Sequence, residues 1–145
     1  MSGDIVTGKC ACEEVKFHVR GNAITTLACY CPQCRKASGG SGHLLAIYDT
    51  EQVEVDSGSE HLGTFVIEGD KTTSGHDKVK VFCKECGTTL WYKVNEGERT
   101  VVITATLDAD YEKTKPQSEI FTRNQPSFIP RIDGTHRFEG MVAPV

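Results

Sequence analysis

The stretch Phe82-Cys83-Lys84-Glu85-Cys86-Gly87 carries the strongest structural signal in the chain. Its cysteines are separated by two residues, a spacing that lets both sulfurs point at one metal ion. Gly87 can take the positive φ angle that turns the backbone around such an ion. A second stretch, Cys31-Pro32-Gln33-Cys34, has the same spacing, and Pro32 holds Cys31 in an extended conformation and starts a turn. We predict that both stretches are metal-binding turns.

The seven cysteines of the chain fall into three groups: Cys10 and Cys12; Cys29, Cys31 and Cys34; Cys83 and Cys86. An odd number of cysteines cannot be fully paired in disulfides, and inert buried cysteines do not explain three tight groups. Thiolates are soft ligands, so clusters with these spacings favour zinc or, less often, an iron–sulfur cluster.

Spacing alone leaves two ways to divide the seven cysteines. The zinc-ribbon partition joins the pair 31/34 to the pair 83/86 around one ion and leaves Cys10, Cys12 and Cys29 over. The other partition forms a closed site from residues 10, 12, 83 and 86 and an open three-thiolate site from residues 29, 31 and 34. The spacing slightly favours the ribbon.

The composition is typical of one globular domain, which we expect to span residues 1–145. The chain is 38% hydrophobic and 25% charged. Its net charge of −4 and pI near 5.7 argue against nucleic-acid and anionic-membrane binding. No stretch approaches the ~18–20 apolar residues of a membrane span, and Met1 to Gly8 has no features of a secretory signal. We therefore expect a cytoplasmic protein whose cysteines are reduced.

The hydrophobic pattern predicts an all-β domain of short antiparallel strands. Apolar and polar residues alternate around Val15 to Val19, Val53 to Val55 and Val79 to Val81. Further strands are expected within 44–48, 61–67, 89–94 and 100–106, and one or two short strands around Ile120-Phe121. No window has a convincing helical period; the best candidate, Asp108 to Glu112, is short. Trp91, Tyr92 and Phe121 are expected in the core or in a pocket wall.

Four segments resemble the glutathione-dependent formaldehyde-activating enzyme family, the domain family of centromere protein V. Gly8-Lys9-Cys10-Ala11-Cys12 with Val15 and Phe17 is similar to its opening motif. Cys29 to Gly39 and Phe82 to Leu90 are similar to its two central cysteine motifs. Thr106 to Asp108 and Glu119 to Phe121 resemble weaker downstream motifs, so the resemblance spans about residues 8–130.

The resemblance implies an Mss4-like fold clasped by zinc, with two zinc ions per chain. It assigns Cys10, Cys12, Cys83 and Cys86 to structural zinc and Cys29, Cys31 and Cys34 to catalytic zinc. It thereby favours the four-and-three partition over the ribbon. The implied activity is that of a carbon–sulfur lyase, which forms and cleaves S-hydroxymethylglutathione from glutathione and formaldehyde.

A three-thiolate zinc with an open position suits a thiol substrate, because a coordinated thiol is held deprotonated at neutral pH. Candidate residues for binding glutathione or its adduct are Arg35, Lys36, Ser38, Gly39 and His43, which follow the cysteine triplet in the chain. Arg35 suits a substrate carboxylate, and His43 is a candidate proton carrier. The segment from Ser38 to Gly42 is read as a turn rather than a phosphate loop.

Tyr30 stands where the family usually has His, and this difference keeps a second hypothesis open: an enzyme of the same fold that acts on another small electrophile or thio-adduct. A third hypothesis is a non-catalytic binding module stabilised by zinc. The oligomeric state is not predicted.

Overall fold

The computed structural model describes residues 3–141. Positions 1–2 and 142–145 of the predicted domain, and with them the first two residues of the N-terminal stretch, lie outside the described residues. Strands dominate the described part of the chain: β1 (Ile5–Lys9), β2 (Lys16–Arg20), β3 (Thr25–Cys29), β4 (His43–Asp49), β5 (Val53–Ser57), β6 (Leu62–Ile67), β7 (Lys78–Cys83), β8 (Thr89–Val94), β9 (Arg99–Ile103), β10 (Ser118–Ile120) and β11 (His136–Arg137). The predicted all-β class is confirmed.

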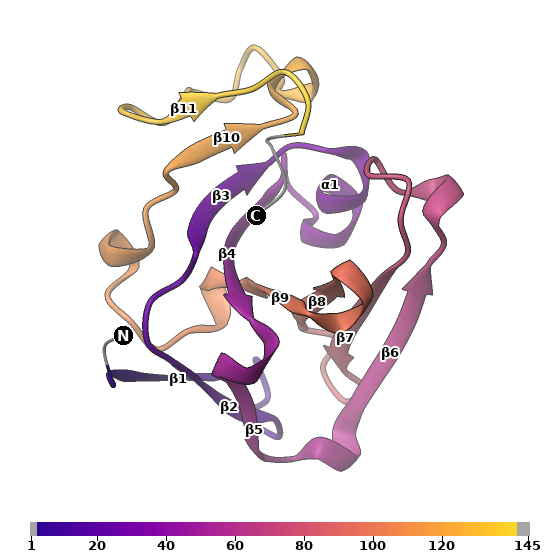
Figure 1. Cartoon of the computed structure of the whole chain (residues 1–145), viewed down its shortest axis with the longest axis vertical. Coiled ribbons are helices and arrows are strands. Elements are labelled where there is room, and N and C mark those ends of the chain that lie inside the picture. Colours follow the sequence, from indigo (N-terminus) through magenta and orange to yellow (C-terminus); the bar gives the residue numbers. More distant parts are fainter. Residues whose placement is uncertain (1–2, 142–145) are drawn as a thin grey trace.

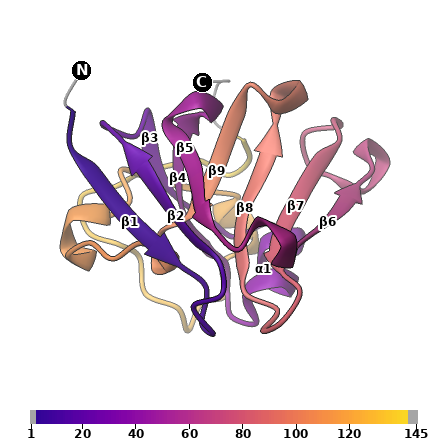
Figure 2. The same ribbon diagram turned by 90° about the horizontal axis from the view of Figure 1, so that it is seen from below.

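Two sheets form the fold. An eight-stranded sheet has the order β11-β10-β3-β4-β9-β8-β7-β6, and a three-stranded sheet has the order β1-β2-β5. The small sheet lies across one face of the large one, as the two views show (Figure 1 and Figure 2). Predicted alternation is seen in β2, where Phe17 and Val19 are buried while Lys16 and Arg20 are exposed. The strands β1 and β3 were not among the predicted ones.

The large sheet buries apolar side chains on both faces. Leu45, Ile47, Val101 and Ile103 belong to the core on the face that carries the only α-helix of the described residues. Their neighbours Ala46 and Val102 belong to the core against the small sheet, where the rings of Phe17 and Trp91 meet edge to face at 5.1 Å. We call these the helix face and the small-sheet face. Strands that are covered on both sides read as nearly continuous apolar runs, which explains the composition of β4 and β9.

One edge of the large sheet departs from the expected antiparallel pattern. β10 pairs in parallel with β3 on one side and with β11 on the other. The short strand expected near Ile120 therefore exists, but it returns across about 90 residues of sequence to lie beside β3. This crossover attaches the C-terminal part of the chain to the strand that ends in Cys29.

The turn expected at Cys31 to Cys34 is the start of a helix, α1 (Pro32–Ser38). Cys31 is the N-cap, with its sulfur accepting from the Cys34 amide, and Pro32 occupies a first-turn position where its missing N–H costs nothing. Gly39 ends the helix with φ 73°, in the left-handed region. The helical candidate at Asp108 to Glu112 is only a 3-10 turn over Tyr111–Thr114. Within residues 3–141, no helix has the length and apolar character needed to cross a membrane.

Candidate metal centres and substrate cavity

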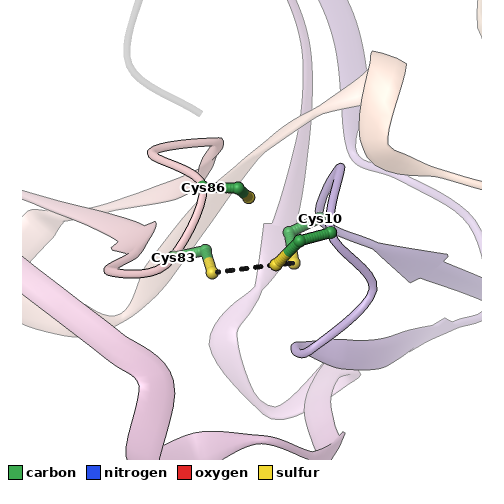
Figure 3. A group of neighbouring side chains, drawn as sticks. Cys10, Cys83 and Cys86 are labelled. Atoms are coloured by element: carbon green, nitrogen blue, oxygen red, sulfur yellow. Dashed lines mark hydrogen bonds between the residues drawn. The ribbon is translucent and has the colours of Figure 1, made fainter.

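The first candidate metal centre joins the two sheets. Cys10 and Cys12 follow β1, Cys83 ends β7, and Cys86 lies in the turn before β8. Their four sulfurs lie within 4.8 Å of one another. The Sγ atoms of Cys10 and Cys12 are 3.6 Å apart, and those of Cys12 and Cys83 are 3.7 Å apart. Figure 3 shows Cys83 and Cys86 on one loop, across from Cys10. We call this group the four-cysteine site.

Both turns of the four-cysteine site depend on residues with positive φ. Gly87 has φ 78°, as the sequence predicted, and its N–H donates to the Cys83 carbonyl at 2.8 Å. Glu13 has φ 65° after the other pair, and its N–H donates to the Cys10 carbonyl at 3.1 Å. The two turns are joined by Thr88, whose hydroxyl accepts from the Ala11 amide at 3.1 Å. Sequence reasoning missed Thr88, because a threonine after a glycine carries no distinctive signal.

The environment of Cys86 favours a thiolate. The hydroxyl of Thr88 lies 3.1 Å from its sulfur and is the main cause that lowers the pKa of Cys86 to about 5. The Val15 amide points at the sulfur of Cys10 at 3.4 Å. Backbone and hydroxyl donors of this kind compensate the negative charge that a cluster of thiolates carries around a metal.

The second candidate metal centre lies at the end of β3 and the start of α1. The sulfurs of Cys29, Cys31 and Cys34 lie within 4.8 Å of one another, and all three residues are buried. The Cys34 amide donates to the sulfur of Cys31 at 3.4 Å. We call this group the three-cysteine site.

The three sulfurs share their protons unequally. Hydrogen bonding from Cys29, and then from Cys34, lowers the pKa of Cys31 to about 2. The same contact with Cys31 is the largest cause that raises the pKa of Cys29 to about 12, and hydrogen bonding to its two neighbours also raises the pKa of Cys34. Cys31 is therefore the thiol of this group whose deprotonated form its neighbours favour, and a thiolate attracts a cation.

Both groups fit zinc by the chemistry and spacing of their donors. Tetrahedral zinc with Zn–S bonds of about 2.3 Å requires sulfurs roughly 3.8 Å apart, close to the 3.6 and 3.7 Å found between sulfurs of the four-cysteine site. The pairs 31/34 and 83/86 belong to different groups. The zinc-ribbon partition is therefore not formed, and the sulfurs divide into four and three.

A cavity of about 480 Å³ opens beside the three-cysteine site on the helix face. Cys29 and Cys34 form part of its wall, together with apolar residues of β3, β4 and β9. Phe121 and Met141 contribute from the C-terminal part of the chain. The segment from Thr73 to Lys78 adds polar groups. Concave, largely apolar spaces with a few polar groups are typical of small-molecule sites.

Two cations line this cavity. Lys78 on β7 is close enough to the three-cysteine site for its charge to contribute to the lowered pKa of Cys31. Arg99 on β9 forms an ion pair with Asp49 at 2.6 Å, and its Nε atom is buried without a hydrogen-bond partner among the described residues. The sequence analysis predicted neither residue. For Lys78 the reason is that lysine alternating with valine in β7 is also the pattern of a solvated strand face.

Tyr92 connects the cavity to His43. The tyrosine lines the cavity, and its hydroxyl lies 3.5 Å from Nε2 of His43. Burial lowers the pKa of His43 to about 4, so its imidazole is neutral at pH 7. Burial and the neighbouring thiols raise the pKa of Tyr92, so its hydroxyl keeps its proton. All three aromatic residues lie where the sequence predicted, Tyr92 and Phe121 in the pocket wall and Trp91 in the core of the small-sheet face.

The predicted substrate-binding residues lie elsewhere. Arg35 and Lys36 are exposed in the last turn of α1, and Gly39 is exposed just after it. Ser38 and His43 line a second hollow of about 450 Å³, which also borders Thr88 beside the four-cysteine site. None of these five residues lines the larger cavity. The segment between Ser38 and Gly42 is a turn, as predicted, with the Gly40 amide donating to the hydroxyl of Ser38.

Tyr30 does not contact the cavity. It is buried, and its hydroxyl donates to Oε2 of Glu119 at 2.6 Å. Burial raises the pKa of Glu119, but hydrogen bonds from Thr135, Tyr30 and Arg137 outweigh that effect and lower it overall. Tyr30 is therefore part of a buried network.

The fold and the two thiol clusters place the chain in a class of proteins. The class comprises small, mostly antiparallel β proteins with two candidate metal centres. A family model described as "Glutathione-dependent formaldehyde-activating enzyme" matches residues 5–124. The chain belongs to this family, which confirms the resemblance seen in the sequence.

The known proteins that are similar to this chain include one curated relative and one solved structure. A curated protein of Halomonas elongata, named "Putative glutathione-dependent formaldehyde-activating enzyme", is 26% identical over 127 residues, covering 86% of this chain and 80% of that protein. The crystal structure of a Rhodobacter sphaeroides protein matches with a TM-score of 0.58 and 21% identity, covering 72% of this chain and 89% of that chain. The second likeness shows a shared fold.

Proposed function

We propose that the chain is a cytoplasmic, single-domain, zinc-dependent carbon–sulfur lyase that forms and cleaves S-hydroxymethylglutathione or a closely related thio-adduct. The observation that supports this proposal best is the placement of the three-cysteine site in the wall of the 480 Å³ cavity. Three buried thiols would leave one position of a tetrahedral metal for a ligand from outside, whereas the four thiols of the four-cysteine site would fill all four positions. The two sites then have different roles, one catalytic and one structural.

Zinc held by Cys29, Cys31 and Cys34 would keep a substrate thiol in its deprotonated, nucleophilic form. In the forward reaction the substrate sulfur forms a bond to the aldehyde carbon, the carbonyl π electrons move to oxygen, and that oxygen takes up a proton. Cleavage reverses these changes, and no oxidant or reductant is needed. What the protein must add is a binding pocket and a path for the proton.

Tyr92 is the side chain best placed to give a proton to the aldehyde oxygen and to take it back. It lines the cavity with Cys29 and Cys34, it stays protonated at neutral pH, and it touches His43. Because His43 is neutral, its ring can exchange a proton with the Tyr92 hydroxyl, depending on its tautomer. We assign the pair to passing a proton to and from the aldehyde oxygen.

Lys78 and Arg99 are suited to the carboxylates of glutathione. Both line the cavity that the thiol must enter, and both are only partly exposed. A cation in a partly buried wall binds a carboxylate more strongly than one in open water, because the effective dielectric is lower. That the exposed pair Arg35 and Lys36 binds a substrate carboxylate stays a prediction.

Metal analysis combined with kinetics tests the proposal. We expect two zinc ions per chain in the native protein and faster exchange between glutathione, formaldehyde and their adduct than the spontaneous rate, measured by NMR exchange spectroscopy. The Cys31→Ser variant should fold, keep one zinc and lose the acceleration. The Cys83→Ser variant should fail to fold, because its site joins the two sheets.

Other outcomes separate the alternatives. One tightly held zinc that Cys31→Ser leaves unchanged would favour a non-catalytic binding module. Two zinc ions and glutathione-induced amide shifts around Cys29 to Cys34, but no acceleration with formaldehyde, would favour a same-fold enzyme for another electrophile. Acceleration that survives in Cys31→Ser would refute the assigned site.

A further inference from the structure

Glu119 is the only carboxylate that is fully buried among the described residues, with 0% of its surface exposed. Its Oε1 accepts from the Thr135 hydroxyl at 2.6 Å, from Arg137 at 2.6 Å and from the Ile132 amide at 3.3 Å. Its Oε2 accepts from the Tyr30 hydroxyl at 2.6 Å. The short distances and the full set of donors make this a rigid network.

The network holds the residue between two of the proposed metal ligands. Tyr30 separates Cys29 from Cys31, and its amide donates to the Ile120 carbonyl at 3.1 Å. In the parallel pairing of β3 with β10, Cys29 lies opposite Ile120 and Ala28 lies opposite Glu119. Because side chains alternate along a strand, Cys29 and Ile120 share the helix face while Glu119 lies on the other face. Tyr30 is thus fixed to β10 through both its main chain and its side chain.

A buried ion pair is a weak source of net stability, because desolvation offsets the attraction. Such a pair does hold its partners in one geometry when every carboxylate oxygen has a hydrogen-bond donor, and both oxygens of Glu119 have one. The Arg137 partner is itself fixed, since its other nitrogen donates to Oε1 of Gln125 at 2.6 Å. The cost of burying Glu119 is therefore better explained by positioning than by stability.

We infer that Glu119 is a positioning residue for the three-cysteine site, acting through the Tyr30 hydroxyl to fix the backbone between Cys29 and Cys31. This inference rests on the proposed metal at that site. Through Arg137 and Thr135, the same carboxylate ties the segment after β10 to the strand that carries Cys29. Outer hydrogen bonds that orient metal ligands commonly change metal affinity by 10–100-fold.

The test measures metal affinity at each site with cobalt(II), whose thiolate absorption bands report the coordination of the metal. In Tyr30→Phe and Glu119→Gln, we expect the affinity of the three-cysteine site to fall by about 10–100-fold, with unchanged affinity at the four-cysteine site. The double variant should lose no more than the larger single loss, because both changes break the same contact. Tyr48→Phe is the matched control, since Tyr48 is equally buried but belongs to the core of the small-sheet face.

A second measurement keeps the inference testable if the three-cysteine site binds no metal, a result that would refute the proposed function by itself. Amide hydrogen exchange within residues 29–34 should rise at least about tenfold in Glu119→Gln, with no change in residues 83–88. Unchanged exchange and unchanged cobalt affinity would overturn the inference. Equal losses at both metal sites would also overturn it, because they would indicate a general loss of stability.

Discussion

At the scale of single residues, the three-cysteine site depends on one glycine that sequence reasoning placed in a turn. A Cβ atom at Gly42 would lie 2.2 Å from the carbonyl oxygen of Cys29 and 3.1 Å from the ring of Tyr30. Real Cβ atoms do not approach backbone this closely, so any side chain would push Cys29 away from its partners. Position 42 therefore requires glycine, because there is no space for a side chain beside Cys29.

We predict that Gly42→Ala lowers the metal affinity of the three-cysteine site at least about tenfold, a loss comparable to that of a displaced supporting contact. Isothermal titration with zinc would measure it. Gly40→Ala is the matched control, because the nearest atom to its Cβ is the hydroxyl oxygen of Ser38 at 3.8 Å. Equal affinity in the two variants would contradict the close approach seen at Gly42.

At the scale of elements, the small sheet is held to the large one by packing as well as by sulfur. Phe17 on β2 is fully buried and meets Trp91 of β8, while Val15 and Val19 are buried on either side of it. The alternation that predicted this strand from sequence also determines which side chains reach the large sheet.

Phe17→Ala should lower the free energy of unfolding by about 3–5 kcal/mol, because it removes a large buried ring and leaves a cavity. Denaturant titration of the zinc-loaded protein would measure the change. Ile5→Ala on the neighbouring strand β1 is the comparison, since Ile5 is 52% exposed and its loss should cost less than about 1 kcal/mol. Similar costs for the two variants would mean that the small sheet does not depend on this contact.

At the scale of the whole molecule, the two candidate metal centres occupy different places in the fold. The four-cysteine site bridges Cys12 and Cys83, which are 71 positions apart in the sequence; Cys12 follows a strand of the small sheet and Cys83 ends a strand of the large one. The three-cysteine site lies within one short segment that β3 and α1 already hold in place. Only the first site closes a long loop of the chain, so a metal bound there would contribute directly to folding.

We predict that a strong chelator removes zinc in two steps. The first zinc leaves the three-cysteine site, which has three ligands beside an open cavity, and the near-UV circular dichroism is largely kept. The second leaves the four-cysteine site together with loss of the tertiary signal, because the sheets separate. Release followed with a zinc-sensitive dye alongside circular dichroism would show the order; unfolding that accompanies the first zinc would contradict it.

The sequence by itself determined most of the strands and all the candidate metal ligands of this protein. Alternation predicted most of the strands, and the spacing of the cysteines identified every candidate ligand, because both signals are local. The role of Gly87 was also readable, since a glycine directly after a two-cysteine turn has a conformational reason to be there.

Only the tertiary structure decided how the pieces combine. Spacing slightly favoured joining 31/34 to 83/86, but the sheets bring Cys83 to Cys12 and keep Cys31 on the other side. The cavity cations and the contact of Tyr30 with Glu119 were equally hidden, because they join residues from separate strands, the latter 89 positions apart. Local patterns specify elements, whereas a site assembled from distant strands depends on pairing and crossovers that no short stretch of sequence encodes.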